Sequence, residues 1–143
     1  MTFLVDTGVL YAEHDTDATR HEDALRALEA VEDGQLGQPY ISDYIYDEAV
    51  TLTQARGDSP EAAKRLGRRL RGAGSYPRLH EIVRVSAAVF EDAVEVFEQY
   101  TDQKLSFTDA TSVALCERRG FDCILSFDDD FDGVSNRVDP TTL

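Results

Sequence analysis

Two carboxylates follow short apolar segments, at positions where an ordinary surface acid is not expected. Asp6 comes directly after residues 2–5, and Asp128 follows residues 123–127. Both segments have the composition of buried strands that end in turns. If the two strands are parallel, both carboxylates lie at the carboxyl edge of one sheet, where α/β proteins bind ligands. The alternative at each position is a turn or helix-cap aspartate.

Two further acids lie on predicted helices. Glu48 has apolar neighbours one helical turn away on both sides, so it projects from the apolar face, whereas Asp47 belongs to the polar face. A buried carboxylate needs a cation, a metal or a proton, and a salt bridge to a core arginine is the alternative. Asp109 lies in the first turn after Ser106, where it would complete a variant capping box or stay ionised beside the positive helix end.

Carboxylates that converge on one edge repel each other unless a positive charge lies between them. Hard oxygen ligands without a histidine or cysteine cluster favour Mg²⁺ or Mn²⁺ over Zn²⁺. Such a site can activate water and neutralise the charge of a phosphodiester during hydrolysis. The four acids therefore predict metal-assisted phosphodiester hydrolysis that uses no nucleophilic side chain.

Strands and helices must alternate to place these acids on one edge. Strands separated by helices need crossover connections, which predicts a parallel sheet covered on both faces and a single three-layer α/β/α domain over residues 1–143. Asp6-Thr7-Gly8 is expected to be a turn, and residues 89, 90, 93, 94 and 97 the inner face of their helix. The expected strands are 2–5, 39–41, 79–85, 121–127 and 137–138, and the expected helices are 17–33, 42–56, 58–72, 86–97 and 106–119.

The excess of acidic residues argues against some classes of function. There are 28 acidic and 14 basic residues, a net charge of −14, which disfavours general electrostatic binding to nucleic acid or to an anionic membrane. Only two of the cations are lysines, a composition that favours adaptation to molar salt, where distant carboxylates are screened. The sequence shows no signal peptide or membrane span, and its two cysteines fit buried thiols in a reduced cytoplasm.

Four segments together resemble the PIN-domain ribonucleases, and within them the VapC-type toxins of type II toxin–antitoxin pairs. Each segment matches one acidic position of that family, in the same order along nearly the whole chain. The segments are Leu4-Val5-Asp6-Thr7, Tyr46-Asp47-Glu48-Ala49-Val50, Phe107-Thr108-Asp109-Ala110 and Ile124-Leu125-Ser126-Phe127-Asp128-Asp129-Asp130-Phe131.

The resemblance implies a PIN-like fold and a metal-dependent endoribonuclease with RNA as substrate and an antitoxin as partner. It makes Asp6, Asp109 and Asp128 ligands of Mg²⁺ or Mn²⁺, and Glu48 a fourth catalytic acid, as a ligand or as a base that orients water. Thr7 and Ser126 would orient a carboxylate or a water, and Asp130 could replace Asp128. The family also implies a homodimer, to which Tyr11, Tyr40, Tyr44 and Tyr46 would contribute apolar contact area.

Other interpretations fit less of the sequence. Asp6-Thr7-Gly8 is also an aspartic-protease signature, but that chemistry needs an all-β body and a second aspartate. A haloacid-dehalogenase-type phosphatase needs an acid at Gly8. A receiver-type signalling domain needs a lysine at the end of a late strand, which neither Lys64 nor Lys104 supplies. A non-catalytic α/β scaffold with an acidic pocket remains an alternative.

One segment concentrates positive charge. Lys64, Arg65, Arg68 and Arg69 lie on one predicted helix, and Lys64, Arg68 and Arg71 share one face of it. They are expected to contact RNA phosphates or the acidic part of an antitoxin. A solvated helix face paired with nearby acids is the alternative.

Overall fold

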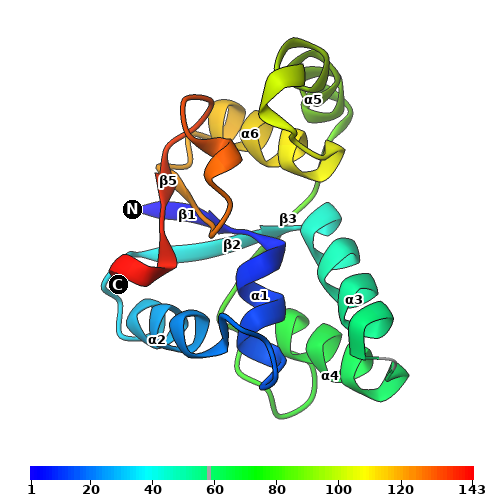
Figure 1. The fold of residues 1–143 in the computed structure, drawn as a ribbon, viewed down its shortest axis with the longest axis vertical. Coiled ribbons are helices and arrows are strands. Elements are labelled where there is room, and N and C mark those ends of the chain that lie inside the picture. The colour runs from blue at the N-terminus through cyan, green and yellow to red at the C-terminus, as the bar shows by residue number, and fades with distance from the viewer. Residues whose placement is uncertain (58) are drawn as a thin grey trace.

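Five parallel strands form the central sheet of the computed structural model, which describes residues 1–57 and 59–143 (Figure 1). The order across the sheet is β3-β2-β1-β4-β5, so β1 is central. The chain therefore adds strands on one side of β1 first and then on the other. The strands are β1 (Thr2–Val5), β2 (Gln38–Ser42), β3 (Glu81–Val83), β4 (Cys123–Leu125) and β5 (Arg137–Val138).

Helices cover both faces of the sheet. Figure 1 shows α1 to α4 on one side and α5 and α6 on the other, which confirms the predicted three-layer α/β/α fold with a parallel sheet. No helix among the residues described here is long and apolar enough to cross a membrane. The helices are α1 (Thr7–His14), α2 (His21–Glu32), α3 (Asp43–Gly57), α4 (Pro60–Arg71), α5 (Ala87–Gln99) and α6 (Phe107–Arg119), with short 3₁₀ helices η1 (Thr101–Gln103), η2 (Asp129–Phe131) and η3 (Pro140–Thr142).

Side-chain caps explain several helix boundaries that the sequence predicts. The hydroxyl of Ser42 accepts a hydrogen bond from the Ile45 amide at the start of α3, and Ser86 caps α5 in the same way. Ser59 caps α4, and the predicted start at Asp58 lies outside the described residues. At the other end of α4, Gly72 has a φ of 63°, a left-handed conformation that glycine adopts without strain.

The first helix differs from the prediction. The segment Asp6-Thr7-Gly8 is not a turn. The strand ends at Val5, Asp6 is the N-cap, and α1 begins at Thr7. The predicted helix 17–33 begins later, at His21, and leaves a loop between α1 and α2. The fold therefore has one more helix at the carboxyl edge of β1 than the sequence indicated.

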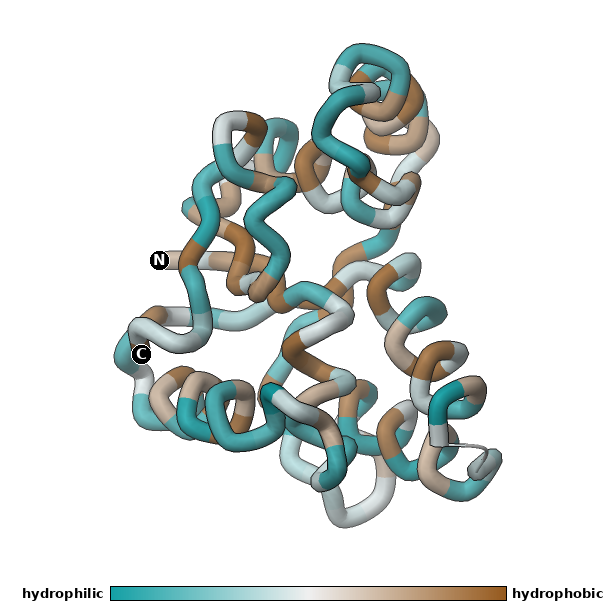
Figure 2. Tube along the Cα trace, viewed as in Figure 1, coloured by the Kyte–Doolittle hydropathy of each residue, from teal (hydrophilic) through white to brown (hydrophobic). Residues whose placement is uncertain are grey.

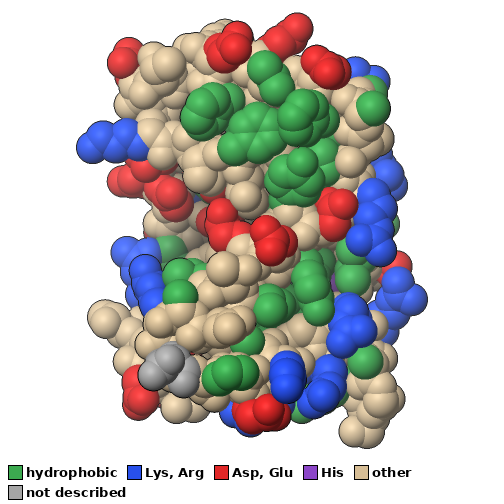
Figure 3. Space-filling view, turned by 90° about the vertical axis from the view of Figure 1, so that its right-hand side faces the viewer, with side chains coloured by type: hydrophobic (Ala, Val, Ile, Leu, Met, Phe, Trp, Pro, Cys, Tyr) green, Lys and Arg blue, Asp and Glu red, His purple; other side chains and the backbone are tan. Residues whose placement is uncertain are grey.

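The inner face of α5 also differs from the prediction. Val89 and Ala93 are buried as expected, but the third core residue is Val96, while Phe90 and Phe97 are 41% and 44% exposed. The ring centroid of Phe107 lies 5.4 Å from that of Phe90 and 5.8 Å from that of Phe97. Figure 2 shows apolar residues in the central strands, and Figure 3 shows a further group of apolar side chains on the outer surface over α5 and the start of α6.

Candidate active site

The carboxyl ends of β1 and β4 lie side by side where the strand order reverses. Val5 is paired with Leu125, so Asp6 and Ser126 leave the sheet next to each other. This is the position at which open α/β sheets form a crevice for ligands. A cleft of about 870 Å³ opens here, between α1, α3 and the start of α6, and its wall includes Asp6, Glu48, Asp109 and Asp128.

Asp6 is held by a buried hydrogen bond. It occupies the N-cap position of α1, yet its side chain makes no capping hydrogen bond, which argues against the helix-cap interpretation. Its Oδ2 instead accepts a hydrogen bond of 2.6 Å from the Ser126 hydroxyl. The side chain is only 7% exposed. Ser126 therefore fixes the direction in which this carboxylate faces the cleft.

Burial raises the pKa of Asp6 to about 7, and the negative charges of Asp109 and Glu48 act in the same direction. The hydrogen bond from Ser126 opposes this rise. A carboxyl group with such a pKa is partly protonated near neutral pH in the absence of a cation. A positive charge in the cleft would therefore favour its ionised form.

Asp109 is positioned by a complete capping box, as the sequence predicts. The Ser106 hydroxyl accepts from the Asp109 amide, and Asp109 Oδ2 accepts from the Ser106 amide, both at 3.0 Å. Burial raises the pKa of Asp109 to about 6, with Glu48 and Asp128 adding to the rise. The capping box uses Oδ2, so Oδ1 remains available to a ligand in the cleft.

Glu48 projects from α3 into the same cleft. It is half-buried, whereas its neighbour Asp47 is exposed. Among residues 1–57 and 59–143, no arginine or lysine forms an ion pair with Glu48, so the salt-bridge interpretation is wrong for this part of the chain. The charge of Glu48 instead acts on Asp6 and Asp109.

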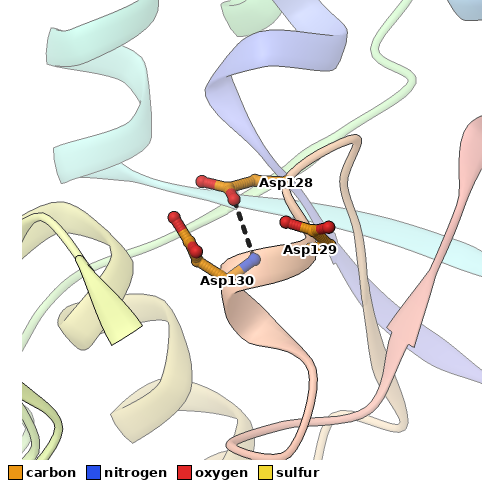
Figure 4. A group of neighbouring side chains, drawn as sticks. All are labelled: Asp128, Asp129 and Asp130. Carbon is orange, nitrogen blue, oxygen red and sulfur yellow. Dashed lines mark hydrogen bonds between the residues drawn. The ribbon is translucent and has the colours of Figure 1, made fainter. Parts of the chain in front are cut away.

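The turn after β4 carries three consecutive aspartates (Figure 4). Asp128 Oδ1 accepts from the Asp130 amide at 2.9 Å, and the Asp128 amide donates to the Ser126 hydroxyl at 3.0 Å. Carboxylate oxygens of Asp128, Asp129 and Asp130 all lie within 4.8 Å of one another. Asp128 and Asp129 line the cleft and Asp130 does not, which favours Asp128 over Asp130 as the fourth acid.

Sequence reasoning missed several residues of the cleft wall. Asp129 follows Asp128 directly, and Asp15 and Arg20 come from the loop between α1 and α2. Tyr11 on α1 and Arg56 in the last turn of α3 also line it. No periodic pattern marks these positions. Only the i, i+4 spacing of Thr7 and Tyr11 could have indicated that both face one side, and this needs α1 to be a helix.

The donor set fits a hard divalent cation. Three aspartates and a glutamate can supply oxygen ligands, and no histidine, cysteine or lysine is among the residues described on the cleft wall. Thr7 also lines the cleft, and its hydroxyl, which is buried, has no hydrogen-bond partner in the described structure. An orphaned hydroxyl beside carboxylates with raised pKa values fits a site built for a cation and its water. Asp6, Asp109, Asp128 and Glu48 are therefore the residues that would hold Mg²⁺ or Mn²⁺.

The basic segment of α4 lies away from the cleft wall. Arg69 donates two hydrogen bonds of 2.7 Å to Glu13, and Lys64 pairs with Glu61. Arg65 and Arg68 are exposed. The lysine of a receiver domain is also absent from the described cleft wall. The contact of these four cations with RNA or an antitoxin remains a prediction. Arg65 and Arg68 are the stronger candidates, because Lys64 and Arg69 already pair with acids.

We expect Asp6→Asn to stabilise the metal-free protein. The folded-state pKa of Asp6, about 7, exceeds its unfolded value of 3.8, so its contribution to stability is complete below pH 4 and is lost as the pH rises toward 7. In EDTA, the variant should melt about 5–10 °C above the wild type at pH 8, and the difference should narrow toward pH 5. Thermal melting at several pH values measures it.

Magnesium should reverse that order. At 100 times its Kd, Mg²⁺ should stabilise the wild type by about 2.7 kcal/mol at pH 8 and leave Asp6→Asn unchanged. Asp47→Asn, on the exposed side of α3, is the control and should respond to Mg²⁺ like the wild type. An equal Mg²⁺ response in Asp6→Asn would show that Asp6 does not bind the ion.

Comparisons with known proteins add a family and a set of similar folds. The PIN domain family model matches residues 3–136. None of the curated proteins matches the chain. Among solved structures, VapC20 of Mycobacterium tuberculosis, a sarcin-ricin loop cleaving toxin, is 25% identical with a TM-score of 0.77, over 90% of this chain and 92% of that one.

Two further structures share the fold at lower identity. A toxin–antitoxin complex from Klebsiella pneumoniae has a TM-score of 0.64 and 21% identity, over 96% of each chain. VapBC2 from Rickettsia felis, bound to a DNA fragment from its promoter, has a TM-score of 0.69 and 12% identity, over 96% of this chain and 98% of that one. These likenesses agree with the parallel sheet and flanking helices described above.

Proposed function

The chain belongs to the PIN domain family, and from this premise we propose that it is a divalent-metal-dependent endoribonuclease, the toxin of a type II toxin–antitoxin pair. One observation carries the proposal. A single serine, Ser126, hydrogen-bonds both the Asp6 carboxylate and the Asp128 amide, and Asp109 and Glu48 face the same cleft. The acids are therefore held in place at the edge of the sheet where the strand order reverses, and they differ in this from ordinary surface charges.

The residues of the cleft would have different roles in hydrolysis. Ser126 and the capping box hold Asp6 and Asp109 in fixed directions, so little reorganisation is needed when an ion binds. When bound, the cation supplies charge neutralisation at the phosphate and lowers the pKa of water. Glu48 is available as a further ligand or as the base that orients the attacking water. Water is the proposed nucleophile, because hydrolysis assisted by a bound cation needs no nucleophilic side chain.

The proposed reaction breaks one phosphodiester bond. A water oxygen forms a bond to phosphorus, the bond from phosphorus to the 3′ oxygen breaks, and the 3′ oxygen takes up a proton. The products are a 5′-phosphate and a 3′-hydroxyl. We propose structured RNA as substrate, and the sarcin-ricin loop is the first RNA to test because the similar VapC20 cleaves it.

Cleavage assays test this function directly. Total RNA and ribosomal RNA are incubated with Mg²⁺, Mn²⁺ or EDTA, from low salt to about 2 M KCl, where the Debye length is under 3 Å. We expect cleavage with either metal, none in EDTA, and activity that survives high salt, as the acid-rich, lysine-poor composition suggests. No cleavage of any RNA with either metal would favour the inactive scaffold, and cleavage in EDTA would mean a different site.

We also propose an antitoxin partner and a cytoplasmic location. One of the similar structures is a toxin–antitoxin complex, which supports a cognate antitoxin for this chain. The two cysteines are free and buried, which agrees with a reducing compartment. Co-expression with the protein encoded beside it, followed by co-purification, tests the partner.

A homodimer is the proposed assembly, with a surface different from the one the sequence suggested. The four tyrosines do not share a face: Tyr11 lines the cleft, Tyr40 packs on Phe121 with ring centroids 4.8 Å apart, and Tyr46 lies against Gly67. Only Tyr44 adjoins exposed apolar groups, through Phe107 at 6.3 Å. The aromatic patch of Phe90, Phe97, Phe107 and Tyr44, seen over α5 and the start of α6 in Figure 3, is the better candidate.

We expect Phe97→Asp to convert the dimer to a monomer without loss of fold. The substitution places a charge on a side chain that is 44% exposed, so the monomer core is unaffected. Light scattering at working salt should give twice the chain mass of 15.9 kDa for the wild type and 15.9 kDa for the variant. A wild type of 15.9 kDa at all concentrations would contradict the dimer.

A further inference from the structure

Two arginines at the acidic cleft are held by aromatic rings. The guanidinium carbon of Arg20 lies 4.7 Å from the centroid of the Phe127 ring, and that of Arg56 lies 5.2 Å from the Tyr11 ring. All four side chains line the same cleft as the catalytic acids. Both distances are within the range of a cation–π interaction. The cleft therefore holds positive charge on its wall, although the chain carries a net charge of −14.

These two arginines differ from the paired cations of the protein. In the described structure no carboxylate lies within 4.0 Å of Arg20 or Arg56, whereas six other cations do form ion pairs. An ion pair neutralises a guanidinium, but a ring contact orients it and leaves its charge and donors available. The six paired cations are Arg26, Lys64, Arg69, Arg78, Arg118 and Arg137.

The rings themselves are fixed. The Tyr11 hydroxyl donates a hydrogen bond of 2.6 Å to Asp15 Oδ2, which locks the ring on which Arg56 lies. Phe127 is partly buried against the hydrophobic core. Each ring is also close in the chain to a residue of the proposed site: Phe127 directly precedes the acid Asp128, and Tyr11 lies one helical turn after the supporting residue Thr7. Each arginine is thus placed on a rigid platform beside the acids.

Neither arginine has a structural task that explains its position. Arg20 is the N-cap residue of α2, where its guanidinium, which only donates hydrogen bonds, cannot cap the helix amides. Arg56 lies in the last turn of α3, where a cation gains only a modest interaction with the helix end. Both side chains are exposed. Because both residues also line the cleft, their donors are accessible to a ligand that enters it.

A ligand that fits two guanidinium groups held on aromatic rings is a polyanion that also carries planar groups. A ring-supported guanidinium offers hydrogen-bond donors for a phosphate and a planar face on which an unstacked base can lie. The two arginines come from different walls, Arg20 from the α1–α2 loop and Arg56 from α3. Phosphates on either side of a scissile bond would otherwise meet only the acids of the cleft, which repel them.

We propose that Arg20 on Phe127 and Arg56 on Tyr11 are two clamps that bind the nucleotides flanking the scissile phosphate in a single-stranded segment, such as a loop, of the structured RNA proposed above. The proposal rests on the ribonuclease function proposed above and names the form of RNA that the cleft accepts. Arg20 and Arg56 are positioning residues, because they hold the strand and take no part in bond breaking.

Steady-state kinetics on a single-stranded RNA that the wild type cleaves is the test. Arg20→Ala and Arg56→Ala should each raise KM about tenfold, the size of effect expected for one stacked base, with kcat within about threefold of the wild type. The slope of log KM against log salt should fall by about 0.7 for each phosphate that the variant no longer binds. Arg119→Ala is the matched control, since Arg119 is exposed at the far end of α6 from Asp109 and outside the cleft.

A binding measurement separates this proposal from the ribonuclease function. Fluorescence anisotropy follows the binding of a labelled single-stranded RNA of about 12 nucleotides, within the usual site size for such segments. The protein carries Asp109→Asn, which slows cleavage, and is measured with and without Arg20→Ala and Arg56→Ala. If the arginine substitutions weaken the affinity for this RNA at least about tenfold, the clamps are supported even if the wild type never cleaves RNA. A wild type that never cleaves RNA would overturn only the proposed nuclease activity. Unchanged affinity and unchanged KM in the double arginine variant, with normal melting and Mn²⁺ binding, would overturn the clamps while leaving the nuclease intact.

Discussion

We expect Asp109→Asn to lower the rate of RNA cleavage by about 10²–10³-fold, the effect of removing one preorganised electrostatic group from an active site. The amide keeps an oxygen that can accept from the Ser106 backbone, so the capping box and the start of α6 survive. The variant loses the negative charge of the Asp109 carboxylate, whose Oδ1 is not used by the capping box. Single-turnover cleavage at saturating Mg²⁺ measures the rate.

The control for this variant is Asp47→Asn, which removes an equal charge from the exposed side of α3. Its rate should stay within about twofold of the wild type, since distant surface charges are screened. The melting temperature of Asp109→Asn in EDTA should equal or exceed that of the wild type, because burial raises the pKa of Asp109 to about 6. A rate that is unchanged in Asp109→Asn would remove Asp109 from the site.

We expect Phe131→Ala to cost about 3–5 kcal/mol of unfolding free energy, the usual range for a buried phenylalanine. Phe131 is fully buried in the main core and ends η2, the turn that carries Asp128. The loss leaves a cavity beneath the acidic turn, so Asp128 also loses its support. Denaturant unfolding measures the stability, and the Mg²⁺-induced rise in melting temperature, which should shrink, measures the effect on the site.

Phe97→Ala makes the same chemical change at a side chain that is 44% exposed. Its cost in unfolding free energy should stay below about 1 kcal/mol, since little apolar surface is uncovered in the monomer. A Phe131→Ala variant no less stable than Phe97→Ala would mean that the core beneath the acidic turn repacks freely.

The acids of the cleft were predictable because sequence signals fix their environment. A short apolar strand followed by an acid places Asp6 and Asp128 at the carboxyl edge of a parallel sheet. The register of β1 with β4 puts Asp6 beside Ser126, two residues before Asp128. The capping signal at Ser106 gives the position of Asp109, and helical periodicity gives the inward direction of Glu48. Each inference needs only local pattern and the rule that parallel strands end on one edge.

The remainder of the cleft depends on tertiary contacts that no local pattern records. Arg20 and Arg56 come from a loop and a helix end, and their rings come from other segments. The helix α1 was missed because it is only eight residues long and because Asp6-Thr7-Gly8 directly follows a strand, a combination that also describes a turn. Its existence brings Tyr11 to the cleft.

The α5 helix shows a different limit. Its apolar residues cover so much of its circumference that two faces satisfy the helical period, one with Phe90 and Phe97 inward and one with Val96 inward. Periodicity cannot choose between them, because the choice depends on the space left against α6 and the sheet. The structure uses the smaller side chains for the core and leaves the larger rings on the surface.

A manganese titration tests the central claim, that these carboxylates hold the divalent ion that cleavage requires. Mn²⁺ is added to metal-free protein, and bound ion, measured by electron paramagnetic resonance, and RNA cleavage are followed in the same samples. We predict that occupancy and cleavage rise together in the wild type, and that both are lost in Asp6→Asn and kept in Asp47→Asn. Cleavage before any ion is bound, or full binding in Asp6→Asn, would contradict the claim.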